Sequence, residues 1–228
     1  VRIPDKNIRP LAGHPLLAYS VASALDSGIF DRVVVSTDST RYAEIALRYG
    51  AGILLRPPEF ATDTSPDIEW VKHALSRVPC DAFAILRPTS PFRKAATIQR
   101  AWKEFNTEVP YDSLRAVEKC HEHPAKMWAI SHGHLHPIMP MMRGTTGAPG
   151  HSSQYPTLPV VYVQNASLEM AWRRTVDLTD SIAGESIKAF LTVEDEGFDV
   201  NNGHDWDVAE LMVQRGEATL PPVRVPAL

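Results

Sequence analysis

The first residues of the chain, VRIPDKN, combine side chains that suit the binding of a phosphate-rich ligand. Arg2 and Lys6 supply positive charge and Asn7 supplies an amide, while Pro4 restricts the backbone of the turn. Short basic turns are more often solvated surface than binding sites, so this pattern needs support from other segments. Asp38 gives some of this support, because it ends the β-branched run DRVVVSTD. Open α/β sheets present ligand-binding residues at the carboxyl ends of their strands.

Residues 87–93, RPTSPFR, follow the strand-like run FAIL and carry a second set of polar groups. Thr89 and Ser90 offer hydroxyls, Arg87 offers a fixed charge, and two prolines stiffen the turn. An ordinary proline-punctuated loop between a strand and a helix is the alternative interpretation of the same residues.

A third segment, EGFDVNNGHDW, gathers oxygen donors near the end of the chain. We expect Asp199 to follow a strand, with Asn201, Asn202 and Asp205 nearby, and Mg²⁺ prefers oxygen ligands of this kind. The alternative is a helix start capped by Asn or Asp, which contributes about 1 kcal/mol to stability. The two interpretations are compatible.

The histidines of SHGHLHP form a fourth pattern. His132, His134 and His136 alternate around a glycine, which is typical of a hairpin tip with exposed imidazoles. We favour the hairpin over a zinc site.

Strand and helix patterns alternate through the first half of the chain, which indicates βαβ units. We expect a first helix that begins near Pro15 and ends at Gly28, and a closing helix over 204–216. The other expected elements of the first half are strands at 33–37, 52–55 and 83–86 and helices at 40–48, 67–77 and 94–105. The fold class predicted is therefore α/β, with a doubly wound, mostly parallel sheet and helices on both faces.

The pattern changes between residues 113 and 165, where short strand-like pieces alternate with turns and a Gly/Pro-rich stretch. We predict an α/β core formed by 1–112 and 166–228, and a subdomain over 113–165 that serves as a dimerisation arm or a lid. The apolar runs MWAI and VVYV have no evident partner in one small sheet, so a homodimer is expected.

Composition limits the partners. The chain has 228 residues, a net charge of −4 and a pI near 6.1, which favours neither nucleic acid nor an anionic membrane as a partner. No apolar run reaches membrane length, and no secretory signal pattern precedes the fold. The only cysteines, Cys80 and Cys120, provide no disulfide framework, so we expect a cytoplasmic location.

Seven motifs, taken in order along nearly the whole chain, carry a family resemblance. They are RIPDKN, PLLAYSVASALDSGIFDRVVVSTDS, LRPPEFATDTSPD, LRPTSPFR, EHPAKMW, YVQN and GFDVNNGHDW. The sequence resembles the acylneuraminate cytidylyltransferases, the CMP-sialic acid synthetase family. The resemblance implies a Rossmann-like nucleotidyltransferase core with a small dimerisation domain. It also implies that CTP and Mg²⁺ are used to activate a nonulosonic acid, an acidic nine-carbon sugar, with release of pyrophosphate.

The same resemblance implies a nucleotide site. Its expected residues are Arg2, Lys6, Asn7, Arg56, Asp63 and Thr64. The first three resemble the end of the family's N-terminal nucleotide loop, where cations meet the triphosphate. Arg56 resembles an arginine that holds the nucleotide, and Asp63 and Thr64 belong to a loop near the base.

The resemblance also implies a sugar site and a metal site. The expected sugar-binding residues are Arg87, Thr89, Ser90, Lys126, Gln154 and Asn165, with Lys126 supplied across the dimer. The expected metal ligands are Asp199, Asn201 and Asp38. Asn201 stands where the family commonly has a second acid. Arg87 stands where many relatives have glutamine. It either pairs with the sugar carboxylate through two hydrogen bonds or belongs to a different sugar preference.

The implied reaction needs positive charge more than acid–base groups. The anomeric hydroxyl of the sugar attacks the α-phosphorus in line while pyrophosphate leaves, so the site must neutralise a polyanion and position two oxygens. Lys6 and Asp199 are the expected catalytic residues, and the sequence does not identify a general base. A non-catalytic module that binds sugar nucleotides is the alternative function.

Overall fold

The computed structural model describes residues 3–62 and 64–224. The chain forms two compact units, a larger unit of Val1–Ala116 with Asn165–Leu228 and a smaller unit of Val117–Gln164. The sequence placed the boundaries at 112/113 and 165/166, so the structure adds residues 113–116 and Asn165 to the larger unit. Arg2 and Asp63, both expected in the nucleotide site, lie outside the described residues.

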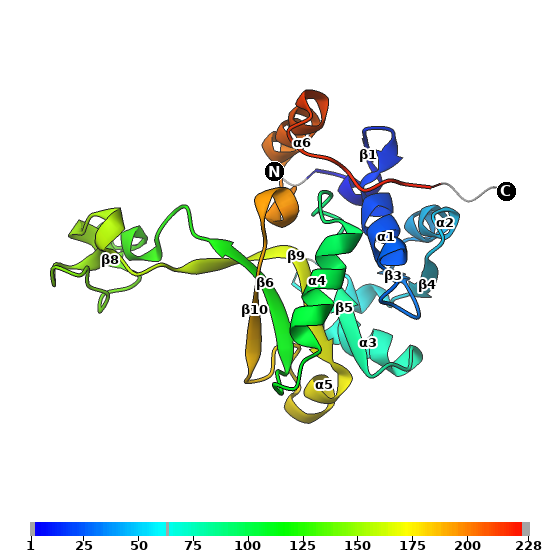
Figure 1. Cartoon of the computed structure of the whole chain (residues 1–228), viewed down its shortest axis with the longest axis horizontal. Coiled ribbons are helices and arrows are strands. Elements are labelled where there is room, and N and C mark those ends of the chain that lie inside the picture. Colours follow the sequence, from blue (N-terminus) through cyan, green and yellow to red (C-terminus); the bar gives the residue numbers. More distant parts are fainter. Residues whose placement is uncertain (1–2, 63, 225–228) are drawn as a thin grey trace. The chain divides into compact units, whose positions relative to one another are not determined.

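The larger unit alternates strands and helices (Figure 1). Its first half contains η1 (Lys6–Ile8), β1 (Pro10–Leu11), β2 (His14–Pro15), α1 (Leu16–Ser27), β3 (Val34–Thr37), α2 (Thr40–Arg48), β4 (Gly52–Leu55), η2 (Pro58–Phe60), α3 (Asp67–Arg77), β5 (Ala82–Ile85) and α4 (Ala95–Phe105). Its second half contains most of β6 (Ser113–Lys119) and β9 (Tyr162–Trp172), then α5 (Arg173–Thr179), β10 (Ile187–Leu191), η6 (Glu194–Gly197) and α6 (Gly203–Arg215). The predicted helices at 40–48, 67–77 and 94–105 and the predicted strand at 52–55 are confirmed to within one residue.

Local sequence explains where these helices begin and end. Pro15 occupies the N-cap position of α1, and Gly28 ends the helix with a left-handed φ of 64°, which glycine adopts without steric cost. Ser39 caps α2, because its hydroxyl accepts a hydrogen bond from the Tyr42 amide at 3.4 Å. Asp199 follows strand β10, as predicted, although η6 lies between the strand and that residue.

Strands of the larger unit form a four-stranded sheet in the order β10-β6-β9-β5 and a parallel pair, β3-β4. Within the four-stranded sheet, strand β9 runs antiparallel to β5. The register of this pair places Glu169 opposite Ile85, two residues before the loop that begins at Arg87. The predicted α/β class is therefore confirmed, with an antiparallel strand in the middle of the sheet.

Helices cover both faces of the four-stranded sheet. On one face, Ala84 of β5 packs into a cluster with Ile98 of α4. On the other face, the next residue, Ile85, packs with Val71 of α3. Neighbouring strand residues point to opposite faces, so this alternation gives each face its own apolar core. No helix among the described residues is long and apolar enough to cross a membrane.

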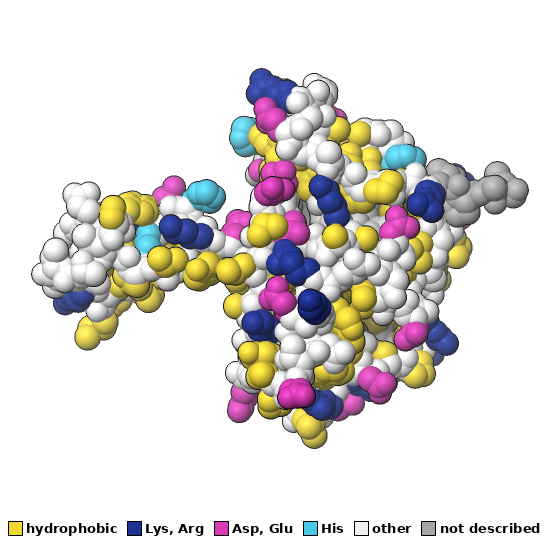
Figure 2. All heavy atoms as spheres, in the orientation of Figure 1, with side chains coloured by type: hydrophobic (Ala, Val, Ile, Leu, Met, Phe, Trp, Pro, Cys, Tyr) yellow, Lys and Arg dark blue, Asp and Glu magenta, His cyan; other side chains and the backbone are white. Residues whose placement is uncertain are grey.

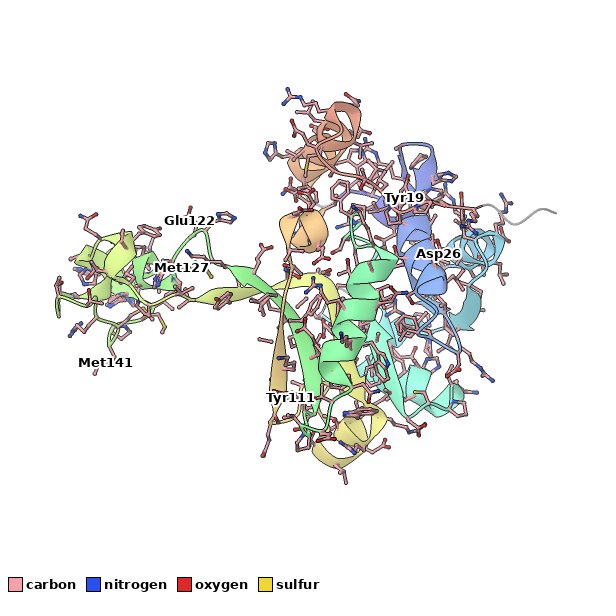
Figure 3. All side chains as sticks on the ribbon, in the orientation of Figure 1. Tyr19, Asp26, Tyr111, Glu122, Met127 and Met141 are labelled. Atoms are coloured by element: carbon pink, nitrogen blue, oxygen red, sulfur yellow. The ribbon has the colours of Figure 1, made fainter. Side chains whose placement is uncertain are left out.

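The smaller unit contains η3 (Pro124–Lys126), β7 (Trp128–Ser131), β8 (His134–Pro137), η4 (Gly150–Ser152) and η5 (Tyr155–Thr157). Strands β7 and β8 form a hairpin whose turn residues, His132 and Gly133, both have positive φ, as a two-residue type I′ turn requires. The predicted hairpin is confirmed. Figure 2 shows many apolar side chains on this unit. Ile130 and Met141 are 76% and 85% exposed, and Figure 3 labels Met141 and the 40% exposed Met127.

Candidate active site

Three segments that are far apart in the sequence meet at the backbone of Val200. The Lys6 ammonium group donates a hydrogen bond of 2.5 Å to the Val200 carbonyl oxygen. The Val200 amide donates one of 2.8 Å to the Thr89 carbonyl oxygen. Val200 itself is fully buried, in an apolar cluster with Phe92. The structure therefore brings together the N-terminal turn, the 87–93 loop and the segment that carries Asp199.

Asp199 keeps one carboxylate oxygen without a protein partner. Its Oδ2 accepts a hydrogen bond of 2.7 Å from the Asn201 side-chain amide. Its Oδ1 is buried and has no hydrogen bond among the described residues. Nearby Asn202 and Asp205 are engaged differently, since they form the capping box of α6. From the sequence, this segment was expected to bind a metal, to cap a helix, or to do both. In the structure, Asn202 and Asp205 cap α6.

The free Asp199 oxygen fits a magnesium ion that is held mainly by a nucleotide. Mg²⁺ commonly binds through one or two carboxylates together with substrate phosphates and water. No group of three or more His, Cys, Asp or Glu side chains suited to a metal occurs in residues 3–62 and 64–224. A site built from Asp199 alone, or from Asp199 with the Asn201 amide oxygen, therefore depends on ligands that the nucleotide supplies. Asp38 follows β3, and no direct contact joins it to Asp199 among the described residues.

The N-terminal turn is held in place by Asp5. This residue has a left-handed φ of 51°, and its carboxylate pairs with Arg41 at 3.1 Å and accepts a hydrogen bond from the Tyr42 hydroxyl at 3.1 Å. Burial, the hydrogen bond to Asp5 and, to a smaller extent, the charge of Asp38 raise the pKa of Tyr42 to about 12. The side-chain oxygen of Asn7 is buried without a partner. Helix α2 thus anchors the turn that carries Lys6 and Asn7.

Arg56 lies at the end of β4 and contacts two neighbouring elements. Its Nη2 donates to the Ser36 carbonyl oxygen at 3.4 Å, and its guanidinium lies 5.7 Å from the centre of the Trp70 ring. Its Nε is buried without a partner. Thr64 is exposed, and its hydroxyl contacts that of Thr62 at 3.4 Å. Among the described residues, no contact joins Thr64 to Arg56.

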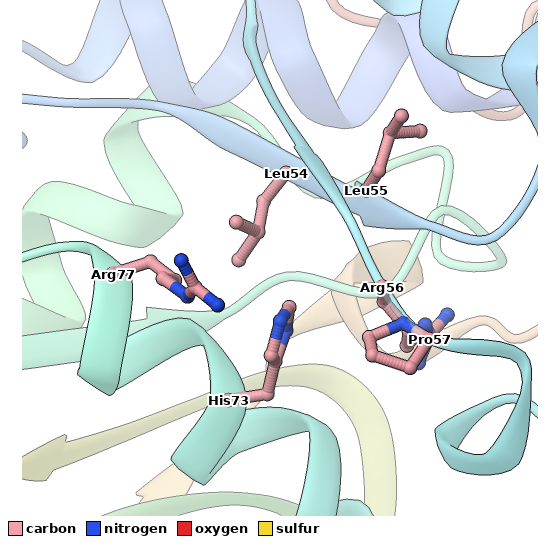
Figure 4. A pocket seen from close by; sticks show the side chains of 6 residues that line it. All are labelled: Leu54, Leu55, Arg56, Pro57, His73 and Arg77. Carbon is pink, nitrogen blue, oxygen red and sulfur yellow. The ribbon is translucent and has the colours of Figure 1, made fainter.

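A pocket of about 470 Å³ adjoins Arg56 (Figure 4). Its lining residues are Leu54, Leu55, Arg56, Pro57, His73 and Arg77. Lys6, Thr89 and Asp199 do not line it, so this pocket is not the place where the three segments meet.

The 87–93 loop is fixed by a fully buried cation, Arg93. Its guanidinium donates to the Arg87 carbonyl oxygen at 3.3 Å, to the Ser167 carbonyl oxygen, and to the Ser20 hydroxyl at 2.6 Å. No carboxylate pairs with it in the described part of the chain, and burial lowers the pKa of Arg93 to about 9. Ser90 in the same loop is 1% exposed, and its hydroxyl has no hydrogen-bond partner.

Strand β9 presents Asn165, Ser167 and Glu169 on one face, because side chains alternate along a strand. The Asn165 amide nitrogen donates to the Thr192 hydroxyl at 2.9 Å, and the Asn165 amide oxygen accepts from the Ser167 backbone at 3.2 Å. The Ser167 hydroxyl is buried without a partner. The carboxylate of Glu169 pairs with Arg87 at 3.3 Å and also with Arg115.

Arg87 belongs to a network of four charged side chains. Its Nη2 pairs with Asp67 and with Glu169, and Glu169 pairs in turn with Arg115. Burial opposes the ionisation of Asp67, but hydrogen bonds from Arg87 and Trp70 outweigh it and lower the pKa of Asp67. The pairing of Arg87 with these two protein carboxylates was not predicted from the sequence.

In the part of the chain that the structure describes, buried side-chain polar atoms without partners concentrate in these segments. They belong to Asn7, Ser36, Arg56, Ser90, Arg93, Ser167 and Asp199, together with His73 of the pocket. Buried polar groups are normally hydrogen-bonded, so a concentration of unpaired ones indicates bound water, an ion or a ligand.

The other two predicted sugar-binding residues lie in the smaller unit. The Lys126 ammonium group donates to the carbonyl oxygens of His151, at 3.1 Å, and Ser153, at 2.5 Å, and it lies 5.8 Å from the centre of the Tyr155 ring. Gln154 is exposed, and its carbonyl oxygen accepts a hydrogen bond from the Thr157 amide at 3.0 Å.

Sequence reasoning missed several residues that support this site. They are Trp70, Arg115, Ser167 and Glu169. One signal was available, since in NASLEM polar residues alternate with apolar ones, a pattern that predicts a strand with one polar face. No sequence signal identified Arg93 as buried or paired Arg87 with Asp67.

Comparison with known proteins gives the family. The sequence family described as cytidylyltransferase matches residues 1–127. The chain is 32% identical over 227 residues to a CMP-N,N′-diacetyllegionaminic acid synthase of Legionella pneumophila, an alignment that covers 96% of this chain and 94% of that protein. It is 45% identical over 116 residues to an N-acylneuraminate cytidylyltransferase of Escherichia coli, which covers 50% of this chain. The latter match spans only 28% of the E. coli protein's length.

Solved structures support the fold. A CMP:2-keto-3-deoxy-manno-octonic acid synthetase complexed with CTP aligns with a TM-score of 0.69 over 94% of both chains, at 12% identity. A 4-diphosphocytidyl-2C-methyl-D-erythritol synthase from Anaerococcus prevotii aligns with a TM-score of 0.60 over 92% of this chain, at 10% identity. The sequence matches and this shared fold agree, and the chain belongs to the cytidylyltransferase family, in the group that contains the acylneuraminate cytidylyltransferases.

Proposed function

We propose that the protein is a cytidylyltransferase that uses CTP to activate a nonulosonic acid, an acidic nine-carbon sugar, to its CMP-sugar with release of pyrophosphate. One observation carries this proposal. The Lys6 turn, the Thr89 loop and the Asp199 segment are joined through Val200, and the Asp199 carboxylate keeps a buried oxygen free. One named relative is an N-acylneuraminate cytidylyltransferase and another is a CMP-N,N′-diacetyllegionaminic acid synthase. These names support the same class of reaction for this chain.

The roles of the residues follow from their chemistry. Lys6 brings positive charge to the triphosphate, and Arg56 and Asn7 bind the nucleotide from its two sides. Asp199, with Asn201 beside it, would hold Mg²⁺ against the phosphates. The bound ion would neutralise charge on the phosphates as the leaving group departs. Thr89, Ser90 and Arg87 orient the sugar for in-line attack on the α-phosphorus.

Dimerisation is part of this proposal. The smaller unit exposes large apolar side chains, including Ile130, Leu135 and Met141, at 59% or more. Covering such surface with a second copy would bury it and would bring Lys126 to the partner's sugar site. Sedimentation at micromolar concentration should show a species of about twice the 25.3 kDa chain mass. A species of single-chain mass alone would remove the role of Lys126 across an interface.

The free thiols Cys80 and Cys120 are both half-buried, and no disulfide involves them. This supports our placing the reaction in the reducing cytoplasm.

The deciding experiment is an assay of pyrophosphate release. Purified protein is incubated with CTP, MgCl₂ and a panel of nonulosonic acids, including N-acetylneuraminic, legionaminic and pseudaminic acids. Matched reactions contain ATP, GTP or UTP, or EDTA in place of the metal. We expect release that needs CTP, metal and one of the acids. Tight CTP binding without release for any acid would favour the alternative, a non-catalytic module that binds sugar nucleotides.

A further inference from the structure

Arg56 and Arg87 are expected in different parts of the proposed site, yet the same helix contacts both. Asp67 is the first residue of α3, and its carboxylate pairs with Arg87. One turn later, the Trp70 ring lies below the Arg56 guanidinium, 5.7 Å from it. The Trp70 indole nitrogen also donates to Asp67 at 2.9 Å, so the two contacts are linked.

Arg87 is restrained through one nitrogen only. Both of its ion pairs, to Asp67 and to Glu169, use Nη2. Its Nη1 and Nε have no hydrogen-bond partner among the described residues, and its side chain is 34% exposed. A guanidinium fixed in this way keeps its Nη1 and Nε hydrogens for a ligand, and each nitrogen can donate a charge-assisted hydrogen bond to a carboxylate.

The buried side of the network explains its rigidity. Glu169 is 5% exposed and uses one oxygen for Arg87 and the other for Arg115. Its position is set by the β5–β9 register, which places it opposite Ile85. Two arginines and two carboxylates balance in charge, so a sugar carboxylate at Arg87 would gain hydrogen bonds from Nη1 or Nε rather than a net charge attraction from the network.

We propose that Asp67, Trp70 and Glu169 are positioning residues, through which the first turn of α3 and strand β9 hold Arg56 ready for the nucleotide phosphates and Arg87 ready for the sugar carboxylate. This inference rests on the proposed function. It makes one short helical turn responsible for the alignment of both substrates. Asp67 also sits where a helix N-terminus favours negative charge, which keeps its carboxylate ionised and available to Arg87.

A competing role for Asp67 predicts the opposite sign. If Asp67 only competes with the sugar carboxylate for Arg87, its removal frees the arginine and lowers the KM for the sugar. If Asp67 positions Arg87, its removal lets the side chain move and raises that KM. The direction of the change therefore separates the two roles.

The test compares four variants with the wild-type protein in steady-state assays with CTP and the preferred acid. Asp67→Asn and Glu169→Gln should each raise the sugar KM about tenfold or more, with the CTP KM within about threefold. Trp70→Leu should raise both KM values, because it removes the ring under Arg56 and the donor to Asp67. Trp70→Phe keeps the ring and should raise mainly the sugar KM. Asp177→Asn, which breaks an ion pair with Arg173 on α5, is the matched control and should change neither.

Each variant is first shown to be folded by circular dichroism and thermal unfolding. A lower sugar KM for Asp67→Asn, or wild-type KM values for all four variants, would overturn the inference. If the wild-type protein itself releases no pyrophosphate, the proposed function fails instead. A separate measurement then still applies, because calorimetric titration with CTP alone should show weaker binding to Trp70→Leu than to Trp70→Phe, and equal affinities would overturn the role of the Trp70 ring.

Discussion

The two ends of the 87–93 loop hold their arginines in opposite ways. Arg93 is fully buried, and its partners are the Ser167 and Arg87 carbonyl oxygens and the Ser20 hydroxyl. Arg87 is one-third exposed and pairs with two carboxylates through Nη2, and its Nη1 and Nε have no partner among the described residues. We infer that Arg93, at the buried end, fixes the path of the loop, whereas Arg87, at the exposed end, is available for a ligand.

Replacing the buried arginine should have the largest effect. We expect Arg93→Ala to lower the free energy of unfolding by about 3 kcal/mol, because it leaves several buried oxygens without donors and opens a cavity. The desolvation cost recovered by removing the charge offsets part of this loss. Urea unfolding followed by circular dichroism measures the change. Arg174→Ala, at an exposed position of α5, is the control and should cost less than about 1 kcal/mol. Equal stability of the two variants would show that Arg93 does not fix the loop.

Asp199 tests the proposed catalytic side of the site. We expect Asp199→Asn to lower kcat for pyrophosphate release by about a hundredfold or more, because an amide replaces the charged metal ligand. Titration with Mg²⁺ should show a higher metal requirement in the variant. Asp207→Asn, at an exposed position of α6, should keep wild-type rates. Activity that survives Asp199→Asn unchanged would exclude the proposed metal role.

The exposed arginine should affect binding more than stability. We expect Arg87→Gln to raise the sugar KM about tenfold or more, because glutamine cannot donate a charge-assisted hydrogen bond to the sugar carboxylate. The free energy of unfolding should fall by less than about 1 kcal/mol, since the remaining pair of Arg115 and Glu169 is retained. If Arg87→Gln lowered the free energy of unfolding strongly and left the sugar KM unchanged, Arg87 would stabilise the fold as Arg93 does and would not bind the sugar.

The smallest effect concerns pH. The pKa of Asp67 in the folded protein is lowered from 3.8, so its ion pair adds stability that is present above that value and is lost as the pH falls through the folded-state pKa. The difference in melting temperature between the wild-type protein and Asp67→Asn should therefore be full at pH 7 and shrink below about pH 4. Thermal unfolding between pH 3 and 7 measures it. If the difference in melting temperature grew as the pH fell, the ion pair of Asp67 would not stabilise the folded protein in the predicted direction.

Much of the fold was predictable because local patterns determine it. The amphipathic periods and caps of α2, α3 and α4 act within each element, so their ranges agree with the sequence. The antiparallel direction of β9 was not predictable, because strand direction depends on connections that no local pattern encodes.

The site was predictable in its outline only. Motif order pointed to Arg87 and Asp199, since each motif contains its own residues. Glu169 escaped attention because its importance comes from a partner 82 positions away, which only the strand register brings near. The smaller unit shows the same limit, because the amine of Lys126 is engaged by backbone carbonyls that the sequence does not single out.

Val200 joins the three segments through its main-chain atoms: its carbonyl oxygen accepts the hydrogen bond from Lys6, and its amide donates the hydrogen bond to Thr89. Any aliphatic side chain that fills the same space can therefore occupy this position without disturbing how the loops are joined. Proline is the exception, since it lacks the amide hydrogen that reaches Thr89. Most single substitutions of Val200 should therefore leave the three segments aligned.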